Sequence, residues 1–378
     1  MRVFRIPQSP FRNRPKAVTL VELLVAIAII SILATLLLGV GAVVGEVARE
    51  ARTKGLIARL HTLVMERYDA YRNRRVELVD YTNDNDLRAL LADFAGFQNI
   101  PTDDGRVRAL TRLAAQREQM KFEMPDRWSD VLGMTLPASV PSTGCTPAAP
   151  ARLLSDEPTL RAVYYRAYCE IEARNNAITG VRNTIDEIVT NQGAELLYLI
   201  VINSTGDGEA RGLFTENEVG DTDGDGALEF IDGWGNPITF LRWAPGFDSS
   251  AQLNTAELAR IERANEGNLI PIIDAIADDH DPLDLFRLDQ PTEATVTTFE
   301  AEPDANEDAR GWRLMPLILS AGGDEEYGIE LAPTNVTAFD PYYGRTAPYL
   351  LGQRLTGDEA EAYADNIHNH AVGTLSQK

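Results

Sequence analysis

An uncharged apolar run from Leu23 to Gly45 constrains the fold of this chain more than any other stretch. The run is 23 residues long, and its only polar side chains are those of Ser31 and Thr35. As an α-helix, which rises about 1.5 Å per residue, it would span the ~30 Å hydrocarbon core of a bilayer. The sequence therefore predicts one transmembrane helix over residues 23–45.

The residues before this run carry an unusual distribution of charge. Residues 1–17 form a basic leader without an acidic side chain; its bases are Arg2, Arg5, Arg12, Arg14 and Lys16. The positive-inside bias predicts that the leader stays in the cytoplasm and that the C-terminal lobe is extracytoplasmic. Glu22 then falls in the first turn of the apolar helix. An ionised carboxylate in hydrocarbon costs roughly 2.5–3.5 kcal/mol, so Glu22 needs a partner or a shallow position.

The string Lys16-Ala17-Val18-Thr19-Leu20-Val21-Glu22-Leu23-Leu24-Val25 resembles the leader junction of the type IV pilin and type II secretion pseudopilin family. The resemblance implies that a prepilin peptidase cuts between Ala17 and Val18, that Val18 becomes a methylated N-terminus, and that Glu22 is the glutamate at the fifth mature position. Two residues depart from the family pattern: Ala17 stands where glycine is usual, and Val18 stands where phenylalanine is usual.

Cleavage before Val18 would create an ammonium group four residues ahead of Glu22. That group can neutralise the carboxylate within one subunit or from a neighbouring subunit packed alongside. We therefore predict a pilin-like structural subunit that assembles through Val18 and Glu22 into a type IV pilus or a type II secretion pseudopilus. Its partners would be other pilin subunits, the prepilin peptidase and the inner membrane. The alternative is a single-pass membrane-anchored surface protein that never polymerises and whose acidic lobe binds a ligand.

The chain is strongly acidic, with a formal net charge of −22. Loss of the five leader bases would bring the mature form to −27. A negative surface does not bind phosphate backbones, which argues against nucleic acid as a partner. No P-loop, GxSxG, HExxH or dinucleotide fingerprint occurs in the sequence, so we predict that the chain is not an enzyme.

Periodicity and punctuation predict an α+β fold behind the leader. Together with the family resemblance, these patterns imply the following order: an N-terminal pilin helix at 18–75, a helical insertion at 76–203, an antiparallel pseudopilin-like sheet lobe at 204–350 with an acidic insertion at 246–310, and a C-terminal tail at 351–378. Apolar residues at helical spacing form one stripe on the second half of the long helix, namely Ile57, Leu60, Val64, Tyr68 and Tyr71.

Shorter elements are expected within these regions. Helical patterns cover 86–94, 106–124, 126–132, a segment that begins near Ser155, and 185–202, and strand patterns cover 228–231, 237–243, 313–320 and 327–331. Two turns, at 232–237 and 320–324, are similar to turns of major pseudopilins. Cys145 and Cys169 would form one disulfide outside the cytoplasm or remain two buried thiols.

A run of alternating acids from Asp221 to Asp232 has the spacing of a twelve-residue calcium loop. Glycine stands at the sharp turn of position 6, and the predicted ligands are Asp221, Asp223, Asp225, the Ala227 carbonyl, Glu229 and Asp232. The Gly-Trp-Gly-Asn-Pro run that follows cannot begin the second helix of an EF-hand. The sequence therefore predicts an isolated structural calcium loop, with a plain acidic turn as the alternative. A second acidic patch at 278–284 is expected to be a solvated loop, with a cation site as the alternative.

Overall fold

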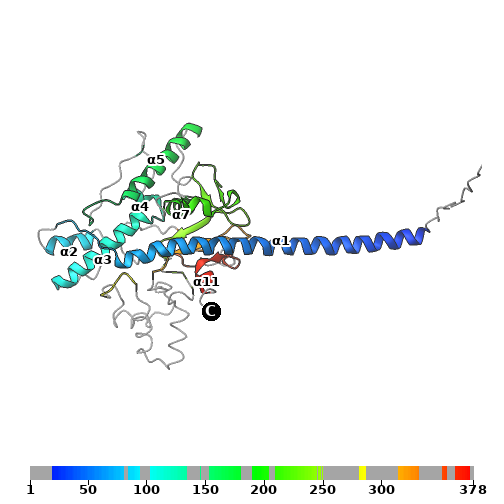
Figure 1. Cartoon of the computed structure of the whole chain (residues 1–378), viewed down its shortest axis with the longest axis horizontal. Helices are drawn as coiled ribbons and strands as arrows, with labels where there is room; N and C mark the ends of the chain where they lie inside the picture. Colours follow the sequence, from blue (N-terminus) through cyan, green and yellow to red (C-terminus); the bar gives the residue numbers. More distant parts are fainter. Residues whose placement is uncertain are drawn as a thin grey trace, which may run out of the picture. The chain divides into compact units, whose positions relative to one another are not determined.

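The computed structural model describes residues 19–80, 84–93, 103–133, 145, 153–179, 190–203, 209–244, 246–247, 249, 281–286, 314–331, 351–355 and 362–374. The chain divides into two compact units, residues 1–48 and residues 49–378. The architecture is α+β, with a long N-terminal helix and small antiparallel sheets, as the sequence predicts (Figure 1). The predicted boundaries of the individual regions stay predictions.

The first helix, α1, extends from Leu20 to Ala70 and continues as a short 3-10 turn, η1, from Tyr71 to Asn73. It thus ends a few residues before the predicted boundary. Among the residues that were searched, which are those the structure describes, no helix is both long and apolar enough to cross a membrane. The predicted span at 23–45 includes the side chains of residues 34–42, which lie outside the described set.

The second half of α1 builds the core of the C-terminal unit. The predicted stripe of Ile57, Leu60, Val64, Tyr68 and Tyr71 is buried, each residue being at most 2% exposed, which confirms it. The Tyr68 hydroxyl donates a hydrogen bond to the Leu314 carbonyl, far along the chain. Because the stripe and this bond both face inward, this part of α1 is fixed to the residues around it.

Helices follow α1 in the order that the sequence predicts. They are α2 (Asp84–Asp93), α3 (Asp104–Glu123), α4 (Trp128–Leu132), α5 (Thr159–Thr179), α7 (Gln192–Ile202) and the 3-10 turns η2 (Glu209–Leu213) and η3 (Glu216–Glu218). Asp103 caps α3 by accepting the Arg106 N–H at 3.0 Å, and the helix ends before Pro125, which cannot donate a main-chain hydrogen bond. Helices α3, α4 and α5 pack against one another (Figure 1).

Two small antiparallel sheets complete the C-terminal unit. Strands β1 (Val219–Gly220) and β2 (Glu229–Phe230) form a pair, and β3 (Ile238–Leu241), β4 (Leu317–Ser320) and β5 (Ile367–His368) form a three-stranded sheet in the order β3-β4-β5. Ile238 lies opposite Ser320 and Leu241 opposite Leu317. Helix α7 packs against β2 and β3 and so connects the two sheets.

A buried ionic network joins the helical region to the end of β3. The Arg242 guanidinium donates to Asp130 at 2.8 Å and to the Met124 carbonyl at 3.0 Å, and its main-chain N–H donates to Asp126 at 3.0 Å. Lys121 lies 3.3 Å from the same Asp130 carboxylate. These cations lower the pKa of Asp130 despite its burial, so the carboxylate stays ionised and holds α3, α4 and β3 together.

The two cysteines form a disulfide, one of the two states that the sequence leaves open. Cys145 and Cys169 are joined by a disulfide, with Cα atoms 5.4 Å apart. It ties residue 145 to α5.

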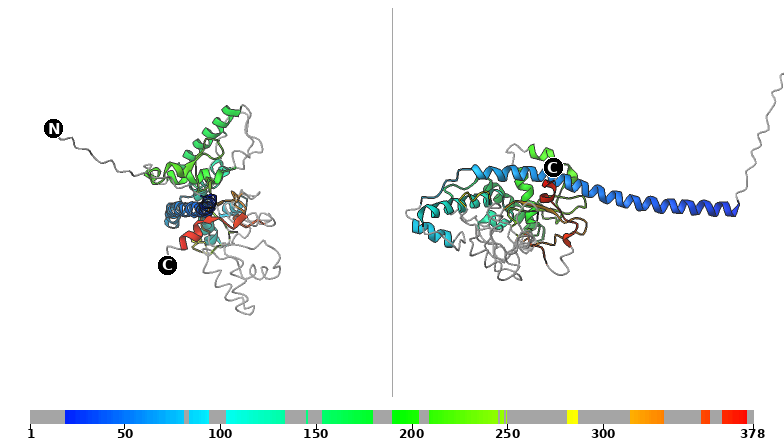
Figure 2. Two further views of the ribbon diagram at one scale, coloured as in Figure 1. Left: turned by 90° about the vertical axis from the view of Figure 1, so that its right-hand side faces the viewer. Right: turned by 90° about the horizontal axis from the view of Figure 1, so that it is seen from below.

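The segment 351–378, predicted as a C-terminal tail, contains a strand and a helix among its described residues. Ile367 and His368 form the third strand of the sheet, and α11 (Asn369–Thr374) follows directly. The buried Asn369 side chain accepts the Ile318 N–H at 2.9 Å and donates to the Pro316 carbonyl at 3.0 Å, which anchors α11. Helix α11 lies beside α1, where Asn369 contacts His61 at 3.0 Å (Figure 2).

Two further expectations fail for physical reasons. Residues 281–284 are not a solvated loop, since Asp281 is buried and pairs with Arg117 of α3 at 2.7 Å. Residues 327–331 do not form a strand: within the described residues they pair with residues 351–355 through one isolated bridge, Ile329 to Arg354. Of the acidic insertion at 246–310, only 246–247, 249 and 281–286 are described.

The candidate processing site and an acidic loop

The start of α1 holds Glu22 in a reciprocal capping arrangement with Thr19. The Thr19 N–H and hydroxyl donate to Glu22 Oε2 at 2.9 and 3.1 Å, and the Glu22 N–H donates to the Thr19 hydroxyl at 3.2 Å. Such a capping box satisfies main-chain donors that have no partner within the helix. Ala17 and Val18, the predicted cleavage pair, lie outside the described residues.

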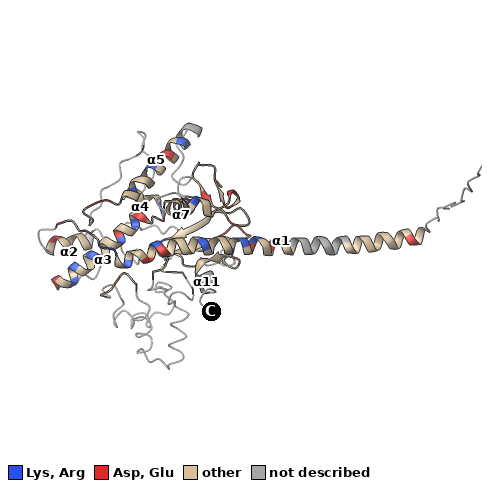
Figure 3. Ribbon diagram, viewed as in Figure 1, with Lys and Arg blue, Asp and Glu red and all other residues tan. Residues whose placement is uncertain are grey.

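Large apolar side chains cover the described part of α1 that follows Glu22. Their exposed fractions range from 49% at Val25 to 65% at Ile30; the others include Leu23, Leu33 and Val43. Figure 3 shows that charged residues lie along the second half of the helix, whereas the described part of the first half has almost none. The first half therefore presents apolar surface that nothing in the described chain covers.

The acidic loop at 221–229 is folded around its own carboxylates. Asp221 accepts the N–H groups of Gly224 and Gly226 at 2.7 and 3.1 Å, and Asp225 accepts the Ala227 N–H at 2.7 Å. Gly224 and Gly226 have φ angles of 80° and 93°, which glycine adopts without a steric penalty. These bonds hold the first three aspartates at one side of the loop, where Asp221, Asp223 and Asp225 each offer an oxygen within 4.8 Å of the others.

Glu195, on α7, completes the group of carboxylates although it lies outside the loop. It offers an oxygen within 4.8 Å of oxygens from Asp223 and Glu229. Its other contact is to the Trp128 indole N–H, which donates to Glu195 Oε2 at 2.8 Å. Asn191, just before α7, donates to Asp223 at 3.1 Å. The sequence reading did not identify Glu195, although a single acid in the apolar helix 192–202 is the kind of buried charge that signals a site.

Asp232, which the sequence also predicts as a ligand, has its carboxylate oxygens hydrogen-bonded elsewhere. Its Oδ1 accepts the N–H groups of Trp234, Gly235 and Asn236, each at 2.9 Å, and its Oδ2 accepts the Ser320 hydroxyl at 2.7 Å. These bonds make Asp232 the cap of the turn at 232–237, a common role for aspartate. Neither group of clustered carboxylates in the described residues includes it. The role of the Ala227 carbonyl as a calcium ligand stays a prediction.

Burial and mutual repulsion perturb three of these carboxyl groups. Burial, reinforced by the charge of Asp225, raises the pKa of Glu195 to about 9. Burial, with the nearby aspartates adding to it, also raises the pKa of Glu229 to about 8. The pKa of Asp225 is raised as well, chiefly by burial, while Arg174 at the loop's edge acts in the opposite direction. Without a bound cation, Glu195 and Glu229 therefore hold their protons near neutral pH, and a cation at the cluster would favour their ionised forms.

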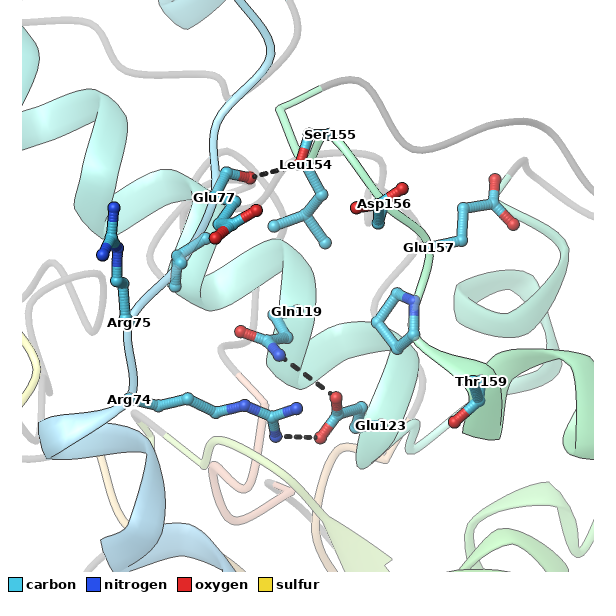
Figure 4. Close-up of a pocket in the computed structure, with 12 residues that line it drawn as sticks. Arg74, Arg75, Glu77, Gln119, Glu123, Leu154, Ser155, Asp156, Glu157 and Thr159 are labelled. Carbon is cyan, nitrogen blue, oxygen red and sulfur yellow. Dashed lines mark hydrogen bonds and ion pairs between the residues drawn. The ribbon is translucent and has the colours of Figure 1, made fainter.

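A surface pocket of about 330 Å³ lies elsewhere, between η1, α3 and the segment before α5. Its polar groups pair mainly with one another: Glu123 accepts from Arg74 at 2.7 Å and from Gln119 at 3.2 Å (Figure 4). Glu123 also accepts the Tyr71 hydroxyl at 2.7 Å. The Glu123 carboxylate of this pocket is thus paired with three side chains. The prediction that the chain is not an enzyme stays a prediction.

Comparison with known families bears on the N-terminal region. Residues 12–38 match the model of the prokaryotic N-terminal methylation motif, the type IV pilin and pseudopilin signature. This chain carries a prepilin-type signature. The motif indicates a pilin-like or pseudopilin precursor that is processed by a prepilin peptidase, and it confirms the resemblance seen at residues 16–25. No curated protein and no solved structure matches the chain.

Proposed function

We propose that this chain is a structural subunit of a type IV pilus or a type II secretion pseudopilus. It is inserted in the inner membrane as a precursor, cut between Ala17 and Val18, methylated at Val18 and assembled through α1. The methylation motif at residues 12–38 is the observation that carries this proposal. The C-terminal lobe is then extracytoplasmic and becomes part of the filament after assembly.

The geometry at Glu22 supports a role for its charge in assembly. The carboxylate is exposed at the N-terminal end of α1, where the helix dipole also favours a negative group. In the mature chain Thr19 would be the second residue, so its capping bonds to Glu22 can persist after cleavage. The Val18 ammonium of an adjacent subunit would then pair with Glu22 when the helices pack together.

The exposed apolar surface of α1 supports helix packing as the mode of assembly. Its side chains between Leu20 and Val47 expose about half or more of their area where they are described. Such a surface is stable only against lipid or against other apolar helices. Lipid holds the subunit before assembly, and neighbouring copies of similar helices replace part of that lipid in the filament.

Three variants separate the charge of Glu22 from its capping contacts. Glu22→Gln keeps an oxygen that can accept from Thr19 but removes the charge, and Glu22→Ala removes both. Thr19→Ala removes the two hydroxyl contacts of the cap while keeping the charge and the main-chain N–H bond to Glu22. Each variant is expressed in cells that assemble the filament. The amount of subunit in sheared filaments is then compared with the amount in the membrane fraction. We expect both Glu22 variants to lose incorporation and Thr19→Ala to retain it, because a single cap contributes only about 1 kcal/mol.

Other patterns would contradict the proposal. Wild-type incorporation of Glu22→Gln would show that the charge is not used. Failure of the wild-type chain to leave the membrane fraction in an assembling cell would instead favour the non-polymerising anchored protein.

A further inference from the structure

We propose that Glu195 of α7 and the loop carboxylates of Asp221, Asp223, Asp225 and Glu229 bind one Ca²⁺ ion. The ligand set differs from the loop pattern in the sequence, because Glu195 takes the place that Asp232 would fill in a twelve-residue calcium loop. The proposal does not depend on filament assembly.

Three carboxylates of the cluster each have a buried oxygen without a hydrogen-bond partner, which is the first argument. Among the described residues, Glu195 Oε1, Asp225 Oδ2 and Glu229 Oε1 are buried without a hydrogen-bond donor. Glu195 and Glu229 are fully buried and Asp225 is 6% exposed. Buried carboxylate oxygens without a donor are costly, so native structures pair them with a donor or coordinate a metal.

The other oxygen of each of these groups is the second argument. Glu195 Oε2 accepts from Trp128, Asp225 Oδ1 from Ala227, and Glu229 Oε2 from the Thr222 N–H at 3.1 Å. Each carboxylate is therefore fixed by one oxygen while the second stays available. Metal ligands are commonly oriented in this way by hydrogen bonds to the atom that does not bind the ion.

Asp223 links the two halves of the cluster. It belongs to the group with Asp221 and Asp225 and also to the group with Glu195 and Glu229. Arg174 donates to the Gly226 carbonyl of the loop at 3.0 Å from the exposed side. Five carboxylates thus form two groups that share Asp223, and the Arg174 guanidinium lies at the edge of the loop. A cation bound by these carboxylates would relieve their mutual repulsion.

The chemistry of the ligands selects calcium. Both groups consist of carboxylates alone, without the histidine or cysteine that zinc prefers. Mg²⁺ demands near-ideal octahedral geometry and keeps several waters, whereas Ca²⁺ accepts six to eight oxygens in flexible arrangements. A site built from five carboxylates on a loop and a helix therefore suits Ca²⁺ better.

The position of Glu195 gives the ion a structural role. A ligand on α7 and four on the loop would join the loop to the helix that packs on β2 and β3. Through the Trp128 indole the same carboxylate reaches α4. Bound calcium would thus stabilise the packing of α4 and α7 against the sheets of the C-terminal unit.

The test uses the full-length chain in detergent, stripped of metal with a chelator and titrated with CaCl₂ by calorimetry. We expect binding of one Ca²⁺ and a rise in Tm on its addition. Glu195→Gln, which can still accept from Trp128, and Asp223→Asn, which lies on the exposed side of the loop, should each weaken Ca²⁺ binding by about tenfold or more. Asp232→Asn is the matched control from the same acidic run and should bind Ca²⁺ as the wild type does.

Three results would overturn the proposal. The first is the absence of Ca²⁺ binding and of any Tm shift in the wild-type chain. The second is wild-type affinity in Glu195→Gln together with lost affinity in Asp232→Asn, which would restore the loop-only ligand set. The third is an equal response to MgCl₂ at the same concentration, which would remove the assignment to calcium. Filament incorporation is measured separately, so a failure here leaves the assembly proposal untouched.

Discussion

Replacing Arg117 by methionine should destabilise the C-terminal unit strongly. Arg117 Nη2 lies 2.7 Å from Asp281 Oδ2, and the two side chains are 0% and 1% exposed. Methionine fills much of the same volume without charge, so the Asp281 carboxylate would stay buried after losing its guanidinium. Removing one partner of a buried ion pair costs about 3–5 kcal/mol. That is a large share of the roughly 5–15 kcal/mol by which a typical domain is stable.

Urea unfolding of the full-length chain in detergent, followed by the fluorescence of the buried Trp128 and Trp243, measures this loss. Arg112→Met is the matched control, since it makes the same substitution at an exposed position of α3 and should change stability by less than about 0.5 kcal/mol. The double variant Arg117→Met, Asp281→Asn should lose less than the sum of the two single variants, because the buried charges disappear together. Equal stability of Arg117→Met and Arg112→Met, or strict additivity, would refute the buried pair and its docking of residues 281–284 on α3.

Two further perturbations test the packing of the C-terminal unit. Gly233→Ala should lower the free energy of unfolding by about 1–3 kcal/mol, because a Cβ there would lie 2.5 Å from the Arg49 carbonyl oxygen of α1. Gly212→Ala is the control, since a Cβ at that position meets no atom within 4 Å. Equal Tm values for the two variants would contradict the close approach of Gly233 to α1. Burial lowers the pKa of His370 to about 4. In the unfolded chain this histidine has a pKa of about 6.5, so between pH 6.5 and pH 4 the unfolded state binds a proton that the folded state does not. The free energy of unfolding is therefore unaffected by His370 above pH 6.5 and decreases by up to about 3 kcal/mol as the pH falls toward 4. His370→Gln should flatten this fall in urea unfolding between pH 7 and pH 4.5, and parallel profiles for the two proteins would disprove it.

Periodic stretches could be predicted from the sequence because burial alone decides them. The stripe from Ile57 to Tyr71 and the short strands at 238–241 and 317–320 follow directly from apolar spacing. The C-terminal segment could not be predicted in this way. Its strand and helix depend on Asn369 and His370, polar residues whose partners come from the distant Pro316 region.

The candidate calcium site also has one part that the sequence predicts and one part that depends on tertiary packing. The run of aspartates at 221–225 is visible in the sequence, because local spacing makes the loop. Asp232 fits that spacing equally well, yet its position before a Gly-Trp-Gly-Asn turn makes it a cap of main-chain N–H groups. Glu195 lies 26 or more residues from the loop, and tertiary packing of α7 alone brings it to the cluster. Only the presence of a single acid within an apolar helix hinted at it.

The mass of the N-terminal peptide tests the central claim most directly. The mature chain is purified from membranes or filaments of a cell that contains a prepilin peptidase, digested, and its N-terminal peptide is identified by mass spectrometry. We predict a peptide that begins at Val18 and carries one methyl group on its amino nitrogen. A chain that still begins at Met1, or one cut at another position, would contradict the account.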